Sequence, residues 1–490
     1  MRWRGIFYLL GSVLLYLSFA MLVPLLWAMW GDGSERIAFS IAIVLTILAA
    51  WAFLRGGQAP SGLTLRESYA FVTLAWLLAS LFSALPFLFS GSVPTLVDAF
   101  FEAMSGLSTT GATVIADVES LAEGVLLWRA MTHWLGGMGI IVLFVAVFPR
   151  LGVSASLLMQ AEAPGPLTQM VTPRIAQTAK VLWLIYIALT AVQTVVLHML
   201  GFSIFDALTH AFATMATGGF STRSASVAAF ANPRVEWAII FFMLVAGGNF
   251  ALYYHLLLGR VRDVLKDGEA RFYLLTIVLA TLLLTISVIP TGYPLEYSIR
   301  HALFQVTSMV TTTGFTTADF DLWPEFSRML LLLLMFVGGC GGSTGGAIKQ
   351  IRILVVLKFF WREVRKAIRP WEVIPLRVGE QVIAPELVNR IVAFVCLYLL
   401  IFACSVLYLT SLDYDLVTAL SAVASAQGNV GPGLGLVGPT HTYAVLVDGA
   451  KIWLAVLMLI GRLEIYTVLS FMLPESLSRR HVQPLRLGRR

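Results

Sequence analysis

The sequence HALFQVTSMVTTTGFTT, residues 301–317, is an apolar run of about eleven residues that ends in a polar stretch containing glycine. Three other segments have the same plan: DAFFEAMSGLSTTGATV at 98–114, DALTHAFATMATGGFST at 206–222 and DLVTALSAVASAQGNVG at 415–431. In each segment a glycine follows the first residue by thirteen positions, at Gly111, Gly219, Gly314 and Gly428. Repetition at a fixed offset indicates one structural unit used four times, which is stronger evidence than any single motif.

Longer apolar stretches flank these segments. Of the 490 residues, 58% are hydrophobic and 12% are charged, which is about half the charged fraction usual in soluble domains. A bilayer core about 30 Å thick is crossed by roughly 20 apolar helical residues. Ten stretches reach or approach this length: 5–29, 37–54, 69–89, 125–148, 181–201, 235–258, 272–290, 328–348, 390–411 and 444–472. The sequence therefore predicts an all-α polytopic membrane protein with ten transmembrane helices, in which the four shorter segments are re-entrant.

Basic residues are distributed unevenly between the two sides of this predicted membrane. With the N-terminus inside, most of the 33 Lys and Arg residues fall on inner segments, including nine from Lys349 to Arg390 and five from Arg479 to Arg490. The positive-inside rule then places both termini in the cytoplasm and all four glycine-containing stretches on the outer side. The same distribution accounts for the net charge of +6, so the composition does not require a nucleic-acid partner.

The repeat divides the chain into five predicted parts. Residues 1–60 form two N-terminal helices outside the repeat, and residues 61–165 and 166–268 form pore repeats 1 and 2. Residues 269–375 form pore repeat 3, whose inner helix is interrupted by glycines near 338–346 and resumes toward 366. Residues 376–490 form pore repeat 4 and a cytoplasmic tail.

Glycine loops at membrane depth predict an ion pathway. Non-helical backbone is tolerated there only when it is buried in protein or lines an aqueous cavity. Four such loops at equivalent depth therefore predict a central pore with fourfold pseudosymmetry. Inward carbonyl oxygens can replace the hydration shell of a cation, and glycine adopts the left-handed conformations of such loops without a Cβ penalty. The short helices would also direct their partly negative C-terminal ends at the cavity.

Acidic residues begin three of the four segments. Asp98, Asp206 and Asp415 are predicted to be N-caps, because a carboxylate there accepts hydrogen bonds from free helix N–H groups. His301 is the exception, since a neutral histidine caps less well. These carboxylates could alternatively attract cations at the mouth of the pore.

The strings STTGAT, ATGGFST, TTTGFTT and AQGNVGPG together resemble the Trk/Ktr/HKT superfamily of potassium transporters. The two extra N-terminal helices, the broken eighth span and the GRLEI segment at 461–465 resemble its TrkH branch, and the resemblance covers essentially the whole chain. It implies potassium uptake across the bacterial cytoplasmic (inner) membrane by a homodimer with one pore per subunit. It also implies a cytoplasmic TrkA-like nucleotide-binding regulatory subunit, potassium as the substrate with no bound cofactor, and no enzymatic activity.

The resemblance assigns the potassium-binding filter to the ends of the four segments. The predicted filter residues are Thr109, Thr110, Gly111, Thr217, Gly218, Gly219, Thr312, Thr313, Gly314, Ala426, Gln427 and Gly428. The fourth stretch departs from the threonine-rich pattern, which leaves the strictness of selection against sodium open. Glycine at all four key positions accompanies potassium preference in the superfamily.

A second glycine-rich string, GGCGGSTGGAIK at 338–349, interrupts an apolar span. Each glycine costs about 1 kcal/mol relative to alanine in a helix, so a straight helix is not expected. We interpret the string as a loop that obstructs the pore, and the family assigns it a gating role. The predicted gate residues are Gly338, Gly339, Gly341, Gly342, Gly345 and Gly346. Close helix packing at these glycines is the alternative.

Arg462 lies deep in the last apolar span. A charge at that depth faces a cavity or a partner, so it is either a barrier to cations beneath the filter or the partner of an acid such as Glu464. Lys451, nearer the outer end, is predicted to extend to the membrane surface or to pair with Asp448. The glycine pairs at 136–137 and 247–248 are predicted to permit close helix approach.

Three other functions remain open at this point. A sodium, ammonium or mixed-cation pathway would use the same loops. An intramembrane enzyme would need catalytic groups at membrane depth, and the sequence has no HExxH motif, no paired intramembrane aspartates and no Ser–His arrangement. A scaffold or sensor would not need four glycine loops.

Overall fold

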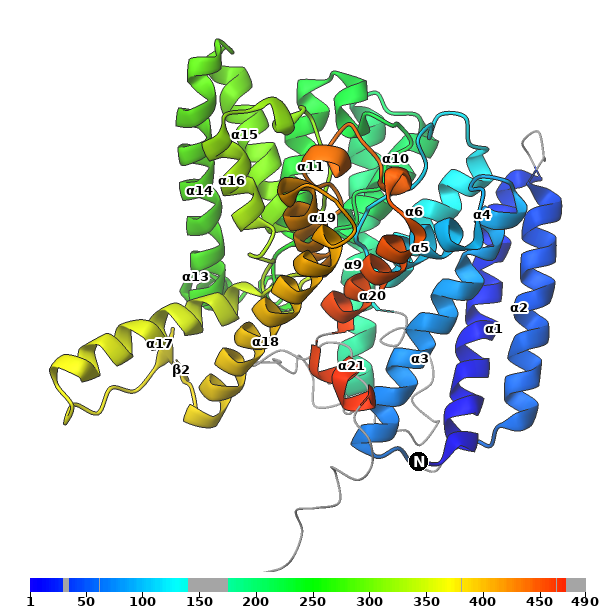
Figure 1. The fold of residues 1–490 in the computed structure, drawn as a ribbon, viewed down its shortest axis with the longest axis horizontal. Helices are drawn as coiled ribbons and strands as arrows, with labels where there is room; N and C mark the ends of the chain where they lie inside the picture. Colours follow the sequence, from blue (N-terminus) through cyan, green and yellow to red (C-terminus); the bar gives the residue numbers. More distant parts are fainter. Residues whose placement is uncertain (30–34, 61, 140–174, 380, 464, 473–490) are drawn as a thin grey trace, which may run out of the picture.

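The computed structural model describes residues 1–29, 35–60, 62–139, 175–379, 381–463 and 465–472, and almost all regular structure in them is helical. Two long helices, α1 (Trp3–Ala28) and α2 (Arg36–Gly56), form an antiparallel pair at one side of the molecule (Figure 1). A Cβ on Gly11 would lie 2.8 Å from the carbonyl oxygen of Ala50, so the absence of a side chain allows the two backbones to approach closely.

Four groups of helices follow, which we call repeats 1 to 4. Each has a long first helix, a short helix and a second helix. The first helices are α3 (Leu65–Ser83, followed by α4, Leu85–Phe89), α9 (Ile175–Met199), α14 (Gly268–Val288) and α18 (Pro385–Thr410). The short helices are α5 (Leu96–Leu107), α10 (Ile204–Met215), α15 (Leu295–Val310) and α19 (Leu416–Gly428). The second helices are α6 (Glu123–Gly137), α11 (Pro233–Ala246), α16 (Glu325–Leu334) and α20 (Asp448–Leu463).

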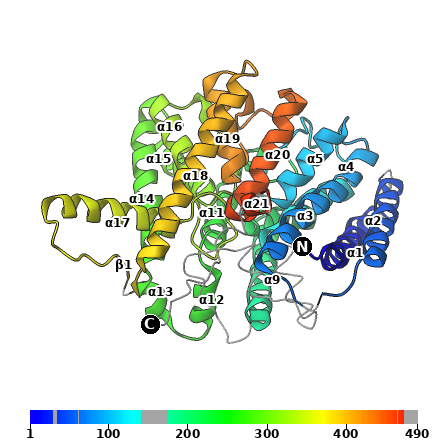
Figure 2. The ribbon, with the colours of Figure 1, turned by 60° about the horizontal axis from the view of Figure 1, so that its bottom comes forward.

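The remaining elements lie between these helices or follow the last of them. They are the helices α12 (Phe250–Leu257), α13 (Val261–Lys266), α17 (Gln350–Ile368) and α21 (Ile465–Met472), and the 3-10 turns η1 (Ser226–Phe230), η2 (Ile289–Thr291), η3 (Phe320–Leu322), η4 (Gly435–Val437) and η5 (Tyr443–Val445). Helix α17 projects away from the body of the molecule (Figures 1 and 2). A small antiparallel hairpin of β1 (Arg377–Val378) and β2 (Gln381–Val382) follows it, with Arg377 opposite Val382.

The last repeat lies next to the first. Helices α18, α19, α20, α5 and α3 are in successive contact, although they come from opposite ends of the chain (Figure 2). The largest buried core is shared by α1, α3, α5, α6, α19 and α20. In contrast, only about a third of the residues of α2, α14 and α18 are buried, and their exposed faces are apolar, as expected for lipid-facing surfaces.

Six helices among the described residues are long and apolar enough to cross a membrane, and α11 and α12 would add a seventh if they form one broken span. The predicted multi-pass helical class is therefore supported, while the count of ten crossings remains a prediction. The predicted crossing 235–258 is not one straight helix, because α11 and α12 meet at 94°. The crossing 328–348 breaks after α16 and resumes as α17, as expected. Residues 140–148 of the crossing 125–148 lie outside the described residues.

Three of the four glycines predicted to permit close approach, Gly136, Gly137 and Gly247, lie against neighbouring segments, whereas Gly248 faces the nearby Tyr253. A Cβ on Gly136 or Gly137 would lie within 3.0 Å of the backbone of Leu107 or Ala216, at the ends of two short helices. A Cβ on Gly247 would lie 2.6 Å from the side chain of Thr311. These glycines therefore bring the second helices against the points where the short helices end.

The N-cap prediction is correct for one of the three aspartates. Asp415 caps α19 and accepts a hydrogen bond of 3.0 Å from the backbone N–H of Thr418. Asp98 and Asp206 instead lie in the first turn, because Thr95 and Ser203 are the N-caps. Carboxylates in the first turn are still stabilised by the positive end of the helix dipole. His301 lies in the middle of α15, which begins at Leu295.

Candidate functional site

The chain that follows each short helix adopts one backbone conformation in all four repeats. A residue in the left-handed region comes first: Thr109 (φ +56°), Thr217 (φ +53°), Thr312 (φ +57°) and Asn429 (φ +55°). Two positions later comes a glycine with positive φ: Gly111 (φ +83°), Gly219 (φ +78°), Gly314 (φ +83°) and Gly431 (φ +108°). The residue between them donates its N–H to a helix carbonyl five positions earlier, as in Thr110 to Ser105, Gly218 to Ala213, Thr313 to Ser308 and Val430 to Ser425. We call residues 109–113, 217–221, 312–316 and 429–433 loops 1 to 4.

Loop 4 corrects the predicted alignment by three residues. Gly428 is the last residue of α19, and Ala426 and Gln427 are also helical, so Gly431 is the equivalent of Gly111. The error arises at the other end of the helix. Asp415 is an N-cap and corresponds to Thr95, whereas the predicted offset aligned it with Asp98, one turn further on. Because Ala426, Gln427 and Gly428 have the backbone dihedrals of a helix, they cannot adopt the loop conformation seen at Thr109 to Gly111.

The four loops contact one another in a closed order. A Cβ on each loop glycine would lie within 3.0 Å of the carbonyl oxygen of the middle residue in the next loop. The pairs are Gly111 with Gly218, Gly219 with Thr313, Gly314 with Val430, and Gly431 with Thr110. Any side chain at these glycines would therefore displace a neighbouring loop, and the left-handed backbone would disfavour it as well.

The middle residues of the loops are supported in different ways. The hydroxyl of Thr110 shares a hydrogen bond of 2.7 Å with Ser108, and Thr313 shares one of the same length with Thr311. In loop 2 the middle residue is Gly218, and the ring of His133 occupies the space that a Cβ would need. The departure of ATGGFST from the Thr-Thr-Gly pattern therefore has a steric cause.

The glycine-rich segment at 338–346 lies against the first residues of loops 2 and 3. The backbone N–H of Gly346 donates a 2.7 Å hydrogen bond to the hydroxyl of Thr312, and the hydroxyl of Thr217 donates to that of Thr344 at 3.3 Å. The hydroxyl of Thr344 donates to the carbonyl oxygens of Met215 at 3.1 Å and Ala246 at 3.3 Å, at the ends of α10 and α11.

The flanks of this segment are anchored from the side. The N–H of Cys340 donates to the carbonyl oxygen of Gly247 at 2.8 Å. The buried carboxylate of Glu269, at the start of α14, accepts hydrogen bonds from the N–H of Gly341 at 2.6 Å and of Ile351 at 3.0 Å. A single acid therefore holds both the segment and the first turn of α17.

Arg462 meets the same segment from α20. Its guanidinium donates to the carbonyl oxygens of Thr344 at 2.6 Å, Gly136 at 2.6 Å and Gly137 at 2.5 Å, and to the hydroxyl of Thr109 at 3.3 Å. Its charge is thus held next to the first residue of loop 1 by carbonyl dipoles. Glu464, the alternative partner, lies outside the described residues.

Lys451 joins the last repeat to the first. Its ammonium nitrogen lies 2.6 Å from Oδ1 of Asp98 and 3.9 Å from Oδ1 of Asp448, and the Lys451 side chain is 7% exposed. The predicted partner is therefore the weaker of two, and the lysine is buried rather than extended to the membrane surface. The closer partner comes from the opposite end of the sequence, so no local pattern could have indicated it.

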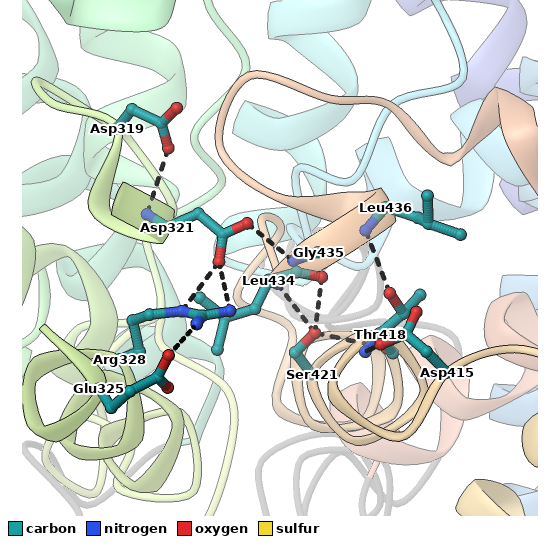
Figure 3. A network of polar contacts seen from close by, with 10 residues as sticks. All are labelled: Asp319, Asp321, Glu325, Arg328, Asp415, Thr418, Ser421, Leu434, Gly435 and Leu436. Carbon is teal, nitrogen blue, oxygen red and sulfur yellow. Dashed lines mark hydrogen bonds and ion pairs between the residues drawn. The ribbon is translucent and has the colours of Figure 1, made fainter. Parts of the chain in front are cut away.

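Repeats 3 and 4 are joined by a network of polar contacts that involves the residues following loop 4 (Figure 3). The carboxylate of Asp321 lies 2.9 Å from Nη2 of Arg328 and accepts a 3.0 Å hydrogen bond from the N–H of Gly435. Ser421 and Thr418 of α19 accept hydrogen bonds from the N–H groups that follow loop 4, at 2.8 Å and 3.1 Å. Backbone N–H groups beyond the loop are thus satisfied by side chains.

Comparison with known proteins agrees with this architecture. The family model described as "TrkH: Cation transport protein" matches residues 34–478. The Trk system potassium uptake protein TrkH of Escherichia coli K12 is 39% identical over 482 residues, which cover 97% of this chain and 99% of that protein.

The chain belongs to the TrkH family.

Other members of the TrkH family are similarly close. The TrkH protein of Halomonas elongata is 39% identical over 97% of this chain and 99% of its own length. The crystal structure of the potassium transporter TrkH from Vibrio parahaemolyticus superimposes with a TM-score of 0.88 at 35% identity, covering 97% of this chain and 99% of that one. The predicted TrkH-branch resemblance is confirmed, and the family is one of transporters.

Sequence reasoning missed several residues of this TrkH-family site, among them Gly431, Asn429 and Thr344. Gly431 was concealed by the three-residue shift, although it stands in the quoted string AQGNVGPG. Asn429 could have been found, because asparagine tolerates the left-handed region better than most residues. Thr344 carries no sequence signal, since its partners are more than 90 residues away.

Proposed function

We propose that this chain takes up potassium across the bacterial cytoplasmic membrane through a filter formed by loops 1 to 4. The observation that supports it is the closed order in which each loop glycine lies against a carbonyl group of the next loop. Such an order is what four equivalent loops around one axis would produce. The names of the Escherichia coli and Vibrio parahaemolyticus relatives, a potassium uptake protein and a potassium transporter, support the choice of ion.

The selection would rest on backbone oxygens. In this proposal the carbonyl groups of Thr110, Gly218, Thr313 and Val430 face a dehydrated potassium ion and replace its hydration shell. The glycine that follows each of them allows the next loop to come close, because no Cβ intervenes. The four short helices end at these loops, so the negative ends of their dipoles stabilise the cation.

The predicted filter list changes accordingly. Loops 1 to 3 keep the predicted residues from Thr109, Thr217 and Thr312 onward, and loop 4 contributes Asn429, Val430 and Gly431. Ala426, Gln427 and Gly428 support loop 4 from the end of α19. Gln427, for example, donates to the carbonyl oxygen of Tyr398 at 2.9 Å.

The gate would be the segment at 338–346. Its hydrogen bonds to Thr217, by way of Thr344, and to Thr312 support a closed position directly against the first residues of two loops. Gly338, Gly339, Gly341, Gly342, Gly345 and Gly346 would allow the segment to change conformation, because glycine has the widest choice of backbone dihedrals.

Arg462 would act as a barrier on the same side. Its guanidinium lies beside Thr109 and also binds the carbonyl oxygen of Thr344. A fixed positive charge there would repel potassium while the segment is closed. Movement of the segment would break the contact with Thr344, while the carbonyl oxygens of Gly136 and Gly137 would still hold the guanidinium.

The assembly is proposed from the resemblance. It comprises a homodimer with one pore per subunit, a cytoplasmic TrkA-like nucleotide-binding subunit, and both termini in the cytoplasm. The five-part division at 60, 165, 268 and 375 is kept as the proposed organisation of each subunit. Coupling to protons or sodium and simple conduction are both compatible with this arrangement.

Rescue of growth tests the function. The full chain, with and without a TrkA-like subunit, is expressed in a bacterium that lacks potassium uptake, and growth is measured at low external potassium. Rubidium and sodium influx are measured in the same cells. We expect growth with both subunits and influx of rubidium in excess of sodium. Absence of growth from a correctly inserted chain, or equal influx of the two ions, would contradict the proposal.

A further inference from the structure

A buried ion pair lies behind loops 1 and 2. Nε of Arg129, in α6, lies 2.7 Å from Oε1 of Glu102, in α5, and the two side chains are 3% and 0% exposed. Removing one partner of such a pair leaves an uncompensated buried charge, so the pair acts as a unit.

Glu102 holds the outer end of loop 1. Both of its carboxylate oxygens accept from the hydroxyl of Thr113 at 3.0 Å, and Oε2 accepts from the N–H of Val114 at 3.0 Å. Thr113 follows the loop glycine Gly111 by two residues. The carboxylate therefore fixes the backbone immediately after the proposed filter.

Arg129 reaches from the same pair to loop 2. Its Nη1 donates to the carbonyl oxygen of Ser221 at 3.0 Å, and its guanidinium carbon lies 3.9 Å from the centre of the Phe220 ring. His133, one turn further along α6, stacks on Phe220 with ring centroids 4.0 Å apart. Phe220 directly follows the loop glycine Gly219, so α6 of repeat 1 holds the outer end of the loop of repeat 2.

The equivalent positions in the other repeats carry no carboxylate. Nine residues before each loop glycine stand Glu102, His210, Gln305 and Ala422. His210 binds the hydroxyl of Ser221 at 2.9 Å, within its own repeat. The other buried ion pairs described, Arg300 with Glu236 and Lys451 with Asp98, join helix to helix. The pair of Arg129 and Glu102 is distinguished by holding the backbone of two successive loops.

We infer that Arg129 is a positioning residue that sets the separation of loops 1 and 2 and thereby the selectivity of the filter for potassium over smaller cations. This inference rests on the proposed function. Arginine suits the task because its planar fork bonds two acceptors and stacks on an aromatic face at the same time. A filter of carbonyl oxygens discriminates between cations through its size and the field of its oxygens, so a change in loop separation alters the discrimination.

Two conservative variants test the inference in the full chain reconstituted in liposomes. Arg129→Lys keeps the charge next to Glu102 but cannot both reach Ser221 and stack on Phe220. Glu102→Gln keeps the shape of the side chain but removes its charge. We expect the potassium-to-sodium permeability ratio, measured as a reversal potential, to fall about tenfold in each, the scale of a single lost charge-assisted hydrogen bond. Rubidium influx should persist.

Glu67→Gln provides the matched control. Glu67 is also a buried carboxylate in an ion pair, 2.9 Å from Nη2 of Arg2, but it lies at the start of α3 far along the chain from any loop. Glutamine retains its capping role at the third helical position. We expect this variant to keep the permeability ratio of the parent chain, even if its unfolding temperature falls.

The outcomes separate the inference from the function on which it rests. A parent chain without potassium selectivity would defeat the proposed function itself. A selective parent whose folded Arg129→Lys and Glu102→Gln variants keep the same ratio would overturn the inference alone. If Arg129→Lys does not insert into the membrane, Phe220→Leu takes its place, because it removes the stacking surface and leaves the ion pair intact. An unchanged permeability ratio in both Phe220→Leu and Glu102→Gln, tested separately, would also overturn the inference.

Discussion

Loops 1 to 3 and loop 4 share a backbone but use their first side chain differently. Thr109 contacts Arg462, and Thr217 and Thr312 contact the segment at 338–346. Asn429 instead donates from Nδ2 to the hydroxyl of Thr110 at 3.0 Å and to the carbonyl oxygen of Met458 at 2.9 Å. Three loops thus face the proposed gate and barrier through hydroxyl groups, whereas the fourth ties the last repeat to the first.

Side chains at equivalent backbone positions thus have different tasks. A hydroxyl has one donor and can exchange partners when a gate moves, whereas an amide with two donors can hold two elements together. A threonine at the fourth position could not reach both Thr110 and Met458. The closure of the ring between the first and last repeats therefore depends on the residue that breaks the sequence pattern.

The largest expected effect comes from adding a side chain to a loop glycine. In Gly314→Ser the φ of +83° alone is unfavourable by about 1–2 kcal/mol, and the new Cβ would collide with the carbonyl group of Val430. We expect the potassium-to-sodium permeability ratio to fall about tenfold or more, since about 1.4 kcal/mol corresponds to a factor of ten. The measurement is a reversal potential in liposomes.

Substitutions in and before loop 4 test whether Gly431, rather than Gly428, is the equivalent of Gly314. Gly431→Ser should reduce the permeability ratio as Gly314→Ser does, because both glycines have positive φ. Gly428→Ser, in the last turn of α19, should lower expression or stability but leave the ratio of the surviving protein unchanged. The opposite result, with Gly428 sensitive and Gly431 tolerant, would reject the corrected alignment.

The next largest effect is expected at the contact between the threonine loops and the gate. Thr344→Val removes the hydroxyl that bonds Met215, Ala246 and Thr217. Loss of about 1 kcal/mol from the closed state would raise leak flux about fivefold, measured as rubidium entry without a regulatory subunit. Thr344→Ser keeps the hydroxyl and is the control. Deletion of Gly338–Gly346 should raise leak further if the chain folds, and unaltered flux in that deletion would remove the gate proposal.

A smaller effect is expected when loop 4 is made to resemble the others. Asn429→Thr loses the hydrogen bonds to Thr110 and Met458, so the buried carbonyl oxygen of Met458 loses a partner. We expect the free energy of unfolding to fall by about 1–3 kcal/mol, measured as a lower unfolding temperature in detergent. Thr312→Ser, which keeps the hydroxyl, should leave stability nearly unchanged. An Asn429→Thr protein as stable as its parent would show that the amide does not hold the ring together.

The smallest effect is expected in the polar network of Figure 3, which joins repeats 3 and 4. Asp321→Asn weakens the ion pair with Arg328 and the hydrogen bond from Gly435. The side chains of Asp321 and Arg328 are each about one-fifth exposed. Partly exposed ion pairs contribute about 0–1 kcal/mol, so stability should change by no more than that. Glu325 also pairs with Arg328, but its side chain is 87% exposed. Glu325→Gln should therefore have no measurable effect on stability. A large loss of stability in Asp321→Asn would show that loop 4 depends on this network more than on Asn429.

Prediction from sequence succeeded where the signal is local. Loops 1 to 3, the break between α16 and α17, and the close approach at Gly136 follow from glycine placement, which constrains the backbone wherever it occurs. Prediction from sequence failed where the same residue type can occupy either of two positions at the start of a helix. An aspartate serves as an N-cap at Asp415 and as a first-turn residue at Asp98, and the choice depends on whether a hydroxyl residue precedes it by one turn.

Hydrophobic length and the conformational needs of glycine act within a few residues. The amino-acid pattern alone therefore indicates a helical membrane protein built on four glycine-containing units. The packing of the helices, in contrast, sets the alignment of loop 4, the carbonyl groups that hold Arg462, and the pairing of Lys451 with Asp98. Those features join residues more than 100 positions apart in most cases. Their geometry follows from how whole helices pack, which no short stretch of sequence specifies.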